Sequence, residues 1–277
     1  MATYKDIKGT SIEVVSSDPS NPQLGQIWYN TTSNTLKGSE LATASWATGG
    51  NLTTARQQLA GAGTQTAGLA FGGETPPPTT NLTEEYNGSS WTNGGNLTTA
   101  RNLLAGAGTQ TAGLAAAGNT GVGSATAATE EYNGSSWTNG GSLTTARGYL
   151  GGAGTQTAAV VFGGSSLPGT TATEEYDGSS WTNGGALTTA VQGMGSAGTQ
   201  TAALSFGGRT SPTTAATEEY DGSSWTSGGA LNSARFFLAG AGTQTAALAF
   251  GGSPILGATE QYDGSSWTTT TSMATKR

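Results

Sequence analysis

The chain contains no cysteine and no histidine among its 277 residues. Without cysteine no disulfide bond braces the fold, and cysteine usage carries no information on the redox compartment. Without histidine the chain lacks the commonest general base and the commonest transition-metal ligand of enzymes. These two absences exclude many kinds of catalytic and metal site.

Charge and long apolar runs are also scarce. Charged residues make up 10% of the chain, and the net charge of −7 argues against a surface for nucleic acid or anionic lipid. No apolar run approaches the roughly 18 residues of a membrane span. The first residues, MATYKDIKGTSIEVV, contain no apolar segment of a secretory signal. We therefore expect no nucleic-acid partner, no membrane insertion and no signal peptide.

Glycine is abundant, and one segment is repeated along the chain. The sequence TEEYNGSSWTNGG at 83–95 recurs unchanged at 129–141, and again from Thr173 and Thr217 with Asp in place of the first Asn and, in the copy from Thr217, Ser in place of the second. A degenerate copy begins at Thr259. Six tryptophans stand 42 to 46 residues apart: Trp46, Trp91, Trp137, Trp181, Trp225 and Trp267. A period of this length with about four strand-like runs per repeat is typical of a β-propeller.

Each repeat contains four runs with the properties of strands. The run AGAGT at 60–64 alternates alanine and glycine, which suits an innermost strand where neighbouring repeats crowd a central axis. The next run, at 67–71, has one bulky and one small face, so that sheets can stack bulky side against small side. Asn87-Gly88 predicts a hairpin with a type I′ turn, and Trp91 opens the outer strand. Each repeat therefore predicts a four-stranded antiparallel blade, which is stable only within a ring of blades.

The order of residues within a repeat resembles that of the kelch repeat of β-propellers. The similarity lies in a Gly-Gly doublet, a spaced Tyr, a Trp and an Arg that opens the next inner strand, and it covers residues 50–272. The first repeat shows these residues as Gly72, Gly73, Tyr86, Trp91 and Arg101. Two departures are expected to loosen their blades. They are Ala116 and Ala117 at the positions of Phe71 and Gly72, and Val191 at the position of an arginine.

Five TQTA segments and five Tyr–Trp hairpins predict an all-β, five-bladed kelch-like propeller over residues 46–277. The sixth tryptophan, Trp46, is surplus to this count. It either adds an outer strand where the ring closes or belongs to the N-terminal region.

Residues 1–45 lie outside the repeat and are interpreted as a separate module with a short β-hairpin. Gln26–Asn30 and Thr35–Gly38 read as two strands around the turn sequence TTSN. The segment GQIWYNTTSNTLKG resembles an N-terminal segment of tail-fibre and other structural proteins of bacteriophages, notably marine ones. The hairpin would cap the edge of the propeller or attach it to a larger particle, and the two roles are compatible.

No pattern of residues in the chain indicates an enzyme. The repeated Glu-Glu pairs occupy adjacent strand positions that face opposite ways, so the two carboxyls cannot act together. We expect one Glu of each pair to meet the recurring Arg or neighbouring backbone, and the other to face solvent. Copper oxidases of the kelch type need His and Cys. The turns DGSS offer too few carboxylates for calcium, GAGTQT lacks the lysine and helix of a phosphate loop, and the serines have no base. We therefore predict no catalytic residue, no metal site and no cofactor.

Recognition is expected on one face of the propeller. In a four-stranded meander the loops after the second and fourth strands emerge on the same side, and here the repeats differ chiefly in those loops. Loops on a rigid scaffold are a usual place for binding, whereas neutral drift would give the same variation. The candidate contact residues are Pro76, Pro77, Pro78, Asn119, Tyr149, Leu167, Arg209, Phe236, Phe237, Ile255 and Leu256.

The phage resemblance implies a non-enzymatic virion structural protein, associated with a tail or fibre. It would bind a host surface glycan or receptor, or a neighbouring virion protein, as one copy or as a homo-oligomer. Its location would be the virion, assembled in the host cytoplasm. The alternative is a cellular kelch-type module that binds protein or sugar and is unrelated to a virion.

Overall fold

The computed structural model describes residues 13–17, 27–38, 45–121, 124–165, 169–254 and 257–275. The chain divides into two compact units, Met1–Ser45 and Trp46–Arg277. All regular structure in the described residues is β-strand. Among these residues there is accordingly no helix long and apolar enough to cross a membrane.

The N-terminal unit contains a three-stranded sheet in the order β1-β2-β3. The strands β2 (Ile27–Asn30) and β3 (Thr35–Gly38) form the predicted hairpin. Its turn is closed by the buried Asn30 side chain, whose Oδ1 accepts hydrogen bonds from the backbone N–H groups of Thr32 (2.9 Å) and Ser33 (3.0 Å). A third strand, β1 (Glu13–Val15), pairs parallel to β2 and was not predicted.

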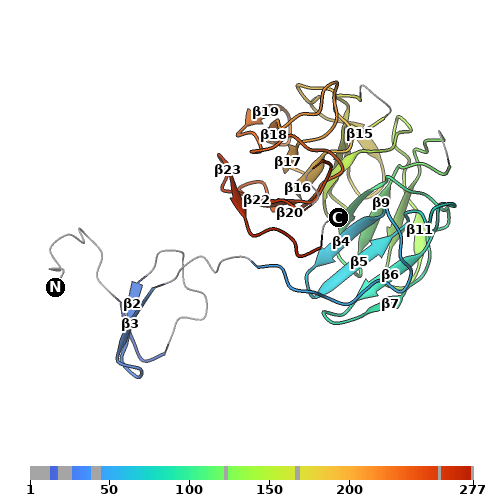
Figure 1. Cartoon of the computed structure of the whole chain (residues 1–277). Helices are drawn as coiled ribbons and strands as arrows, with labels where there is room; N and C mark the ends of the chain where they lie inside the picture. Colours follow the sequence, from blue (N-terminus) through green and yellow to red (C-terminus); the bar gives the residue numbers. More distant parts are fainter. Residues whose placement is uncertain are drawn as a thin grey trace. The chain divides into compact units, whose positions relative to one another are not determined.

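The second unit is a five-bladed β-propeller of four-stranded antiparallel blades, as the repeat predicts (Figure 1). Blade 1 comprises β4 (Ala60–Thr64), β5 (Ala67–Phe71), β6 (Thr83–Tyr86) and β7 (Trp91–Asn93). Blade 2 comprises β8 (Ala105–Gly108), β9 (Gly113–Ala116), β10 (Thr129–Tyr132) and β11 (Trp137–Asn139). Blade 3 comprises β12 (Gly151–Gly154), β13 (Ala159–Phe162), β14 (Thr173–Tyr176) and β15 (Trp181–Asn183). Blade 4 comprises β16 (Gly195–Thr199), β17 (Ala202–Phe206), β18 (Thr217–Tyr220) and β19 (Trp225–Gly228). Blade 5 comprises β20 (Ala239–Thr243), β21 (Ala246–Phe250), β22 (Thr259–Tyr262) and β23 (Trp267–Thr270).

The hairpin between the third and fourth strands of each blade is present, but its predicted turn type is wrong. In blade 1 Gly88 has a φ of 91°, whereas Asn87 does not adopt a positive φ, as a type I′ turn would require. The Asn87 side chain closes the turn instead, because its Oδ1 accepts from the N–H groups of Ser89 (3.0 Å) and Ser90 (2.9 Å). The Asp versions bind the same two N–H groups, and these bonds with the serine hydroxyls lower the pKa of Asp221 to about 2.

Successive blades from 1 to 5 pack a bulky face against a small one. At the junction of blades 3 and 4 the Trp225 ring lies 4.7 Å from Phe162, centroid to centroid, and its Nε1 donates to Thr173 Oγ1 at 2.9 Å. Phe162 has no exposed surface and Trp225 is 5% exposed. The small residues Ala153 and Ala203 lie in the same buried cluster as these rings, which agrees with the bulky and small faces predicted from the run at 67–71.

Two further hydrogen bonds recur at these junctions. Tyr220 donates its hydroxyl to Glu175 Oε1 of the preceding blade at 2.5 Å. Gln200 Nε2 donates to the backbone oxygens of Ala159 (3.1 Å) and Tyr176 (2.7 Å) of that blade. One Glu of each pair was expected to face solvent, and the second Glu is the one that does not meet the Arg. That expectation is wrong for blades 1 to 4, because the tyrosine that contacts this Glu lies in the next blade and was not visible within one repeat.

The first Glu of each pair lies inside its own blade. Glu174 forms an ion pair of 2.5 Å with Arg147, and each side chain is 1% exposed. Glu174 also accepts from the Thr144 N–H at 2.7 Å. Equivalent pairs occur in three other blades: Arg56–Glu84, Arg101–Glu130 and Arg235–Glu260. The predicted contact with the recurring Arg is confirmed, and it makes these carboxylates part of the scaffold.

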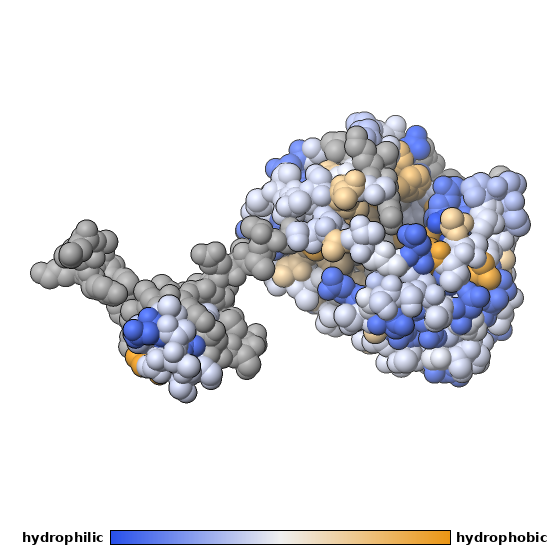
Figure 2. Space-filling view, turned by 60° about the horizontal axis from the view of Figure 1, so that its bottom comes forward, coloured by the Kyte–Doolittle hydropathy of each residue, from blue (hydrophilic) through white to orange (hydrophobic). Residues whose placement is uncertain are grey.

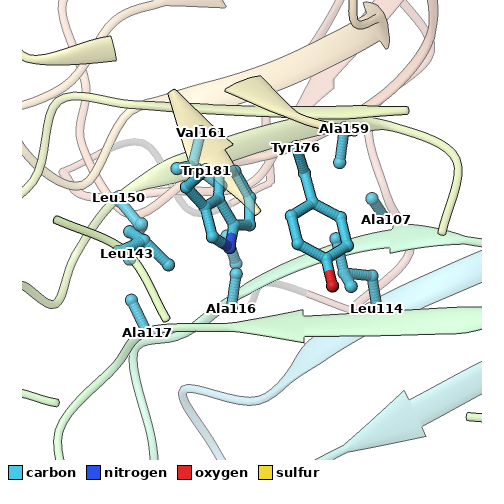
Figure 3. Packing of buried hydrophobic residues seen from close by; sticks show 11 residues of the cluster. Ala107, Leu114, Ala116, Ala117, Leu143, Leu150, Ala159, Val161, Tyr176 and Trp181 are labelled. Atoms are coloured by element: carbon cyan, nitrogen blue, oxygen red, sulfur yellow. The ribbon is translucent and has the colours of Figure 1, made fainter. Parts of the chain in front are cut away.

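The two departures from the repeat are fully packed, contrary to expectation. Ala116 lacks the ring that other blades place against the next Trp, but Val161 from blade 3 is larger than the Ala or Ser at its position in other blades and fills part of that space (Figure 3). The cavity that remains there is too small to hold a water molecule. Val191, 4% exposed, packs with Leu187 and Met194 in the core cluster of blades 3 and 4.

Trp46 belongs to the propeller unit and lies against blade 5. Its ring centroid is 5.0 Å from that of Phe250, and its Nε1 donates to Thr259 Oγ1 at 3.0 Å. Residues 45–50 form no regular strand. Of the two alternatives for Trp46, an outer strand at the ring closure or a place in the N-terminal region, the structure agrees with the first. The segment lies next to the last blade, but it does not pair into a sheet.

Candidate functional site

The loops that differ between repeats lie together at one end of the propeller, termed the loop face here. The first residue of each loop after the second strand pairs with the residue that follows the recurring Arg position. The bridged pairs are Gln57–Glu74, Asn102–Asn119, Gln192–Arg209 and Phe236–Ser253, and Ser165 donates its N–H to Gly148 O at 2.7 Å. The prediction that both sets of loops share one face is therefore confirmed for these residues.

Five residues of the loop face, one before the inner strand of each blade, form an open series that is termed the mouth ring here. They are the second residues after the recurring Arg position, and all have positive φ: Gln58 (56°), Leu103 (53°), Tyr149 (61°), Gly193 (60°) and Phe237 (54°). A chain of backbone hydrogen bonds of 2.7–2.9 Å links them in order, each N–H donating to the carbonyl of the preceding member from Leu103 to Phe237. A left-handed conformation costs a residue other than glycine about 1–2 kcal/mol. Such strain is often found at functional sites.

Aromatic side chains gather on one side of the mouth ring. Tyr149 and Phe237 stack with centroids 5.8 Å apart, and Phe236 packs edge-on against Phe237 at 4.9 Å. Arg209 lies 5.4 Å above the Phe236 ring. These four residues, the aromatic cluster, were all predicted contact residues, and the structure brings them together.

Gly193 makes the stacking of Tyr149 and Phe237 possible. It stands between them in the mouth ring, and a Cβ atom there would lie 2.7 Å from Phe237 Cδ1. Any larger residue at 193 would therefore displace the Phe237 ring. Phe237 is 49% exposed, one of three large hydrophobic residues with an exposed side chain in the described part of the chain. On the face seen in Figure 2 apolar residues form only small separate patches.

Amide groups line the other part of the loop face. Asn102 Nδ2 donates to Gln58 Oε1 and to Glu74 Oε2, both at 2.8 Å, and Gln57 Nε2 donates to Glu74 Oε1 at 2.8 Å. The Oδ1 of Asn102 and the Oε1 of Gln192 are buried without a hydrogen-bond partner among the described residues. Glu74 was not among the predicted contact residues, although it is the one acidic residue in these loops and opens the most proline-rich of them.

The remaining predicted contact residues do not join the aromatic cluster. Pro76, Pro77 and Pro78 are exposed in the loop of blade 1. Asn119 is half-buried and held by its backbone pairing with Asn102. The other three, Leu167, Ile255 and Leu256, lie outside the described residues.

The ionisable groups of the scaffold are engaged with one another. Burial opposes ionisation of Glu84, but hydrogen bonds from Thr53 and Arg56 outweigh it and lower the pKa of this carboxyl. Burial lowers the pKa of the Arg101 guanidinium, an effect that Glu130 opposes. In the part of the chain that the structure describes, no three acidic side chains come together as a metal site would require. The loop face, rather than these pairs, is therefore the candidate site.

Comparison with known proteins adds no family to this description. No protein-family model matches the chain, and no curated protein matches it. The similarity to kelch repeats and to phage structural proteins therefore stays a prediction from the residues quoted above.

Proposed function

We propose that this chain is a non-enzymatic binding protein that recognises a host surface glycan or receptor, or a neighbouring virion protein, through its loop face. The observation that supports this function is the aromatic cluster. Two of its members, Tyr149 and Phe237, hold a costly left-handed backbone conformation, and Phe237 leaves about half of its surface in solvent. Exposed aromatic residues on a rigid frame supply binding area at a low cost in side-chain entropy.

In its finer form the proposal is a structural protein of a phage tail or fibre, with kelch-like blades. The support is the sequence similarity of the segment GQIWYNTTSNTLKG, together with a hairpin in a unit separate from the propeller. Attachment to a particle needs a unit other than the one that carries the loop face, and the N-terminal unit is distinct from the propeller.

Replacing the two stacked aromatics with glycine is expected to abolish recognition without unfolding the protein. In Tyr149→Gly/Phe237→Gly the relief of the left-handed conformations offsets the lost ring stacking, so we expect the unfolding free energy to change by less than about 1.5 kcal/mol. Binding on an array of bacterial surface glycans should fall more than tenfold, since aromatic anchors carry much of the energy of an interface.

The matched control is Leu103→Gly, which relieves the same backbone conformation without touching the aromatic cluster. It should bind as the unaltered protein does. Equal loss of binding in the control, or full binding by the double variant, would contradict the proposed site.

Attachment is tested separately by deleting residues 1–45. We expect the shortened chain to keep the circular dichroism spectrum and melting transition of the propeller, because the two units are distinct. In phage particles, immunogold electron microscopy should then show loss of the chain. Normal incorporation of the shortened chain would refute the attachment role, and a genome without neighbouring capsid and tail genes would favour the cellular alternative.

A further inference from the structure

The junction between blade 5 and blade 1 differs from the other four junctions of the propeller. The inner strands of successive blades pack along one another from β4 to β8, β12, β16 and β20. Among the described residues, β20 and β4 have no comparable contact, and Figure 1 shows them apart.

The hydrogen bonds that recur at the other junctions are missing at this one. Gln110, Gln156, Gln200 and Gln244 each donate to two backbone oxygens of the preceding blade. Their counterpart in blade 1, Gln65, is exposed and has no such bond in the described structure. Tyr86 likewise meets no carboxylate of a preceding blade, whereas the equivalent Tyr132 donates to Glu85 at 2.5 Å.

Both faces of the junction keep their apolar residues partly uncovered. On blade 5, Ala239 and Ala241 are exposed and Leu248 and Phe250 are half-buried. The residues equivalent to the last two in blade 4, Leu204 and Phe206, have no exposed surface. On blade 1, Gly61 is exposed, and Tyr86 and Trp91 are half-buried.

The segment that begins at Trp46 holds this junction at its outer rim. Trp46 contacts Phe250 and Thr259 of blade 5 as Trp267 contacts Phe206 (4.8 Å) and Thr217 (2.9 Å) of blade 4.

The same segment reaches blade 1. Gly50 donates its N–H to Tyr86 Oη at 3.5 Å, as Gly141 does to Tyr176 at 3.4 Å. Residues 46–50 therefore stand where the outermost strand of a further blade would stand, and the three inner strands of that blade are absent from the described structure.

Direct contact between blades 5 and 1 is disfavoured by Trp46. At a regular junction, Trp91 of blade 1 would donate to Thr259 of blade 5. Trp46 already makes that hydrogen bond and covers Phe250. The two tryptophans would compete for one position.

We propose that this junction is a docking site for a three-stranded antiparallel β-sheet supplied by another polypeptide, which completes a sixth blade. The four regular junctions define the chemistry of that sheet. A face of Gly and Ala would cover Leu248 and Phe250, and a face of Leu and Phe would cover blade 1. A glutamine amide would donate to the backbone oxygens of Ala247 and Tyr262, and a carboxylate would accept from Tyr86.

A peptide cut from this chain serves as the probe. Residues 192–224 contain the three inner strands of blade 4 and no tryptophan, so a change in tryptophan fluorescence on mixing comes from the full-length protein, in which Trp46 and Trp91 border the junction. We expect saturable one-to-one binding, a blue shift of the emission and a higher melting temperature of the protein. The peptide with Gln200→Ala and Glu219→Ala should bind at least tenfold more weakly, since it lacks both recurring contacts. Equal binding by the two peptides, or no binding, would overturn the proposal.

A variant of the protein tests the position of the site. Ala241→Arg places a charge on the exposed blade 5 face and should abolish peptide binding with an unchanged melting temperature of the free protein. Ala230→Arg, at an exposed position outside the strands, is the control and should bind normally. Binding by Ala241→Arg, or loss of binding in the control, would count against this junction.

Cross-linking tests whether the ring closes on itself. The chain has no native cysteine, and a Cβ built on Gly152 would lie 2.9 Å from Ala105 Cβ of the preceding blade, so a small separation of the two strands brings this pair into the roughly 3.5–4.5 Å range of a disulfide. Ala105→Cys/Gly152→Cys should therefore oxidise readily. The equivalent pair across the junction, Ala239→Cys/Gly61→Cys, should stay reduced. Formation of that disulfide within one chain, or a dimer linked by it, would replace the proposal with self-closure or self-association.

Discussion

Arg147→Val is expected to lower the free energy of unfolding by about 3–5 kcal/mol, because it leaves the Glu174 carboxylate buried without its counter-ion. Both side chains are 1% exposed. The Nε and Nη2 of Arg147 have no partner in the described structure, so the pair itself is not strongly stabilising, and the cost lies in breaking it. Urea denaturation followed by tryptophan fluorescence measures the change.

Blade 4 shows how the equivalent glutamate is held in the absence of the arginine. It carries Val191 at the arginine position, and its Glu218 accepts hydrogen bonds from the N–H groups of Thr188 (2.7 Å) and Thr189 (3.1 Å) instead. Neutralising the orphaned carboxylate in Arg147→Val/Glu174→Gln should restore more than half of the lost stability, whereas Glu218→Gln alone should cost less than about 1.5 kcal/mol. A loss below about 1 kcal/mol for Arg147→Val would show that water reaches Glu174.

Raising the pH from 10 to 12 is expected to unfold the propeller. Burial, aided by a hydrogen bond to a glutamate of the preceding blade, raises the pKa of Tyr132, Tyr176, Tyr220 and Tyr262 to about 12. The unfolded value is about 10, so the folded state holds these protons more tightly and gains stability that is fully present below pH 10 and disappears as the pH rises to 12. Because the same loss occurs at four junctions, it is expected to be a large part of the stability of a typical domain.

Unfolding free energies measured at intervals from pH 9 to pH 12 test this expectation. Tyr176→Phe should be less stable than the parent at neutral pH and should lose less stability over the alkaline range. Tyr86→Phe is the matched control, because the described structure gives this hydroxyl no glutamate partner, and it should cost less than about 1 kcal/mol. Flat stability up to pH 12, or equal effects of the two variants, would show that the hydrogen bonds to Glu131 and its equivalents contribute little.

The blades could be predicted because their signals are local. Alternation of Ala and Gly, the Asn-Gly or Asp-Gly turn and the period of the tryptophans each act within about 45 residues, and four strands per blade follow from them. The turn type was missed, because a general preference of Asn-Gly pairs was outweighed by the side chain of Asn87 and the two serines after it.

Contacts between blades were harder to predict. The partner of Glu131 is Tyr176, 45 residues further on, and nothing within one repeat indicates it. The aromatic cluster unites residues of three blades, and its members were selected for their variability and exposure rather than for their proximity. The open junction depends on the ring as a whole, although the similarity of WATGG at 46–50 to WTNGG at 91–95 is visible in the sequence.

The backbone conformation of the mouth ring is the same at every position, whichever side chain stands there. Its members are Gln, Leu, Tyr, Gly and Phe, yet they share one backbone conformation, and each is joined to the next by a main-chain hydrogen bond. A single-codon change at one of these positions can therefore alter what the protein contacts while the frame stays intact, provided that the new residue tolerates a left-handed backbone. In the recognition role proposed above, a surface of this kind would follow a changing target through many generations without a new fold.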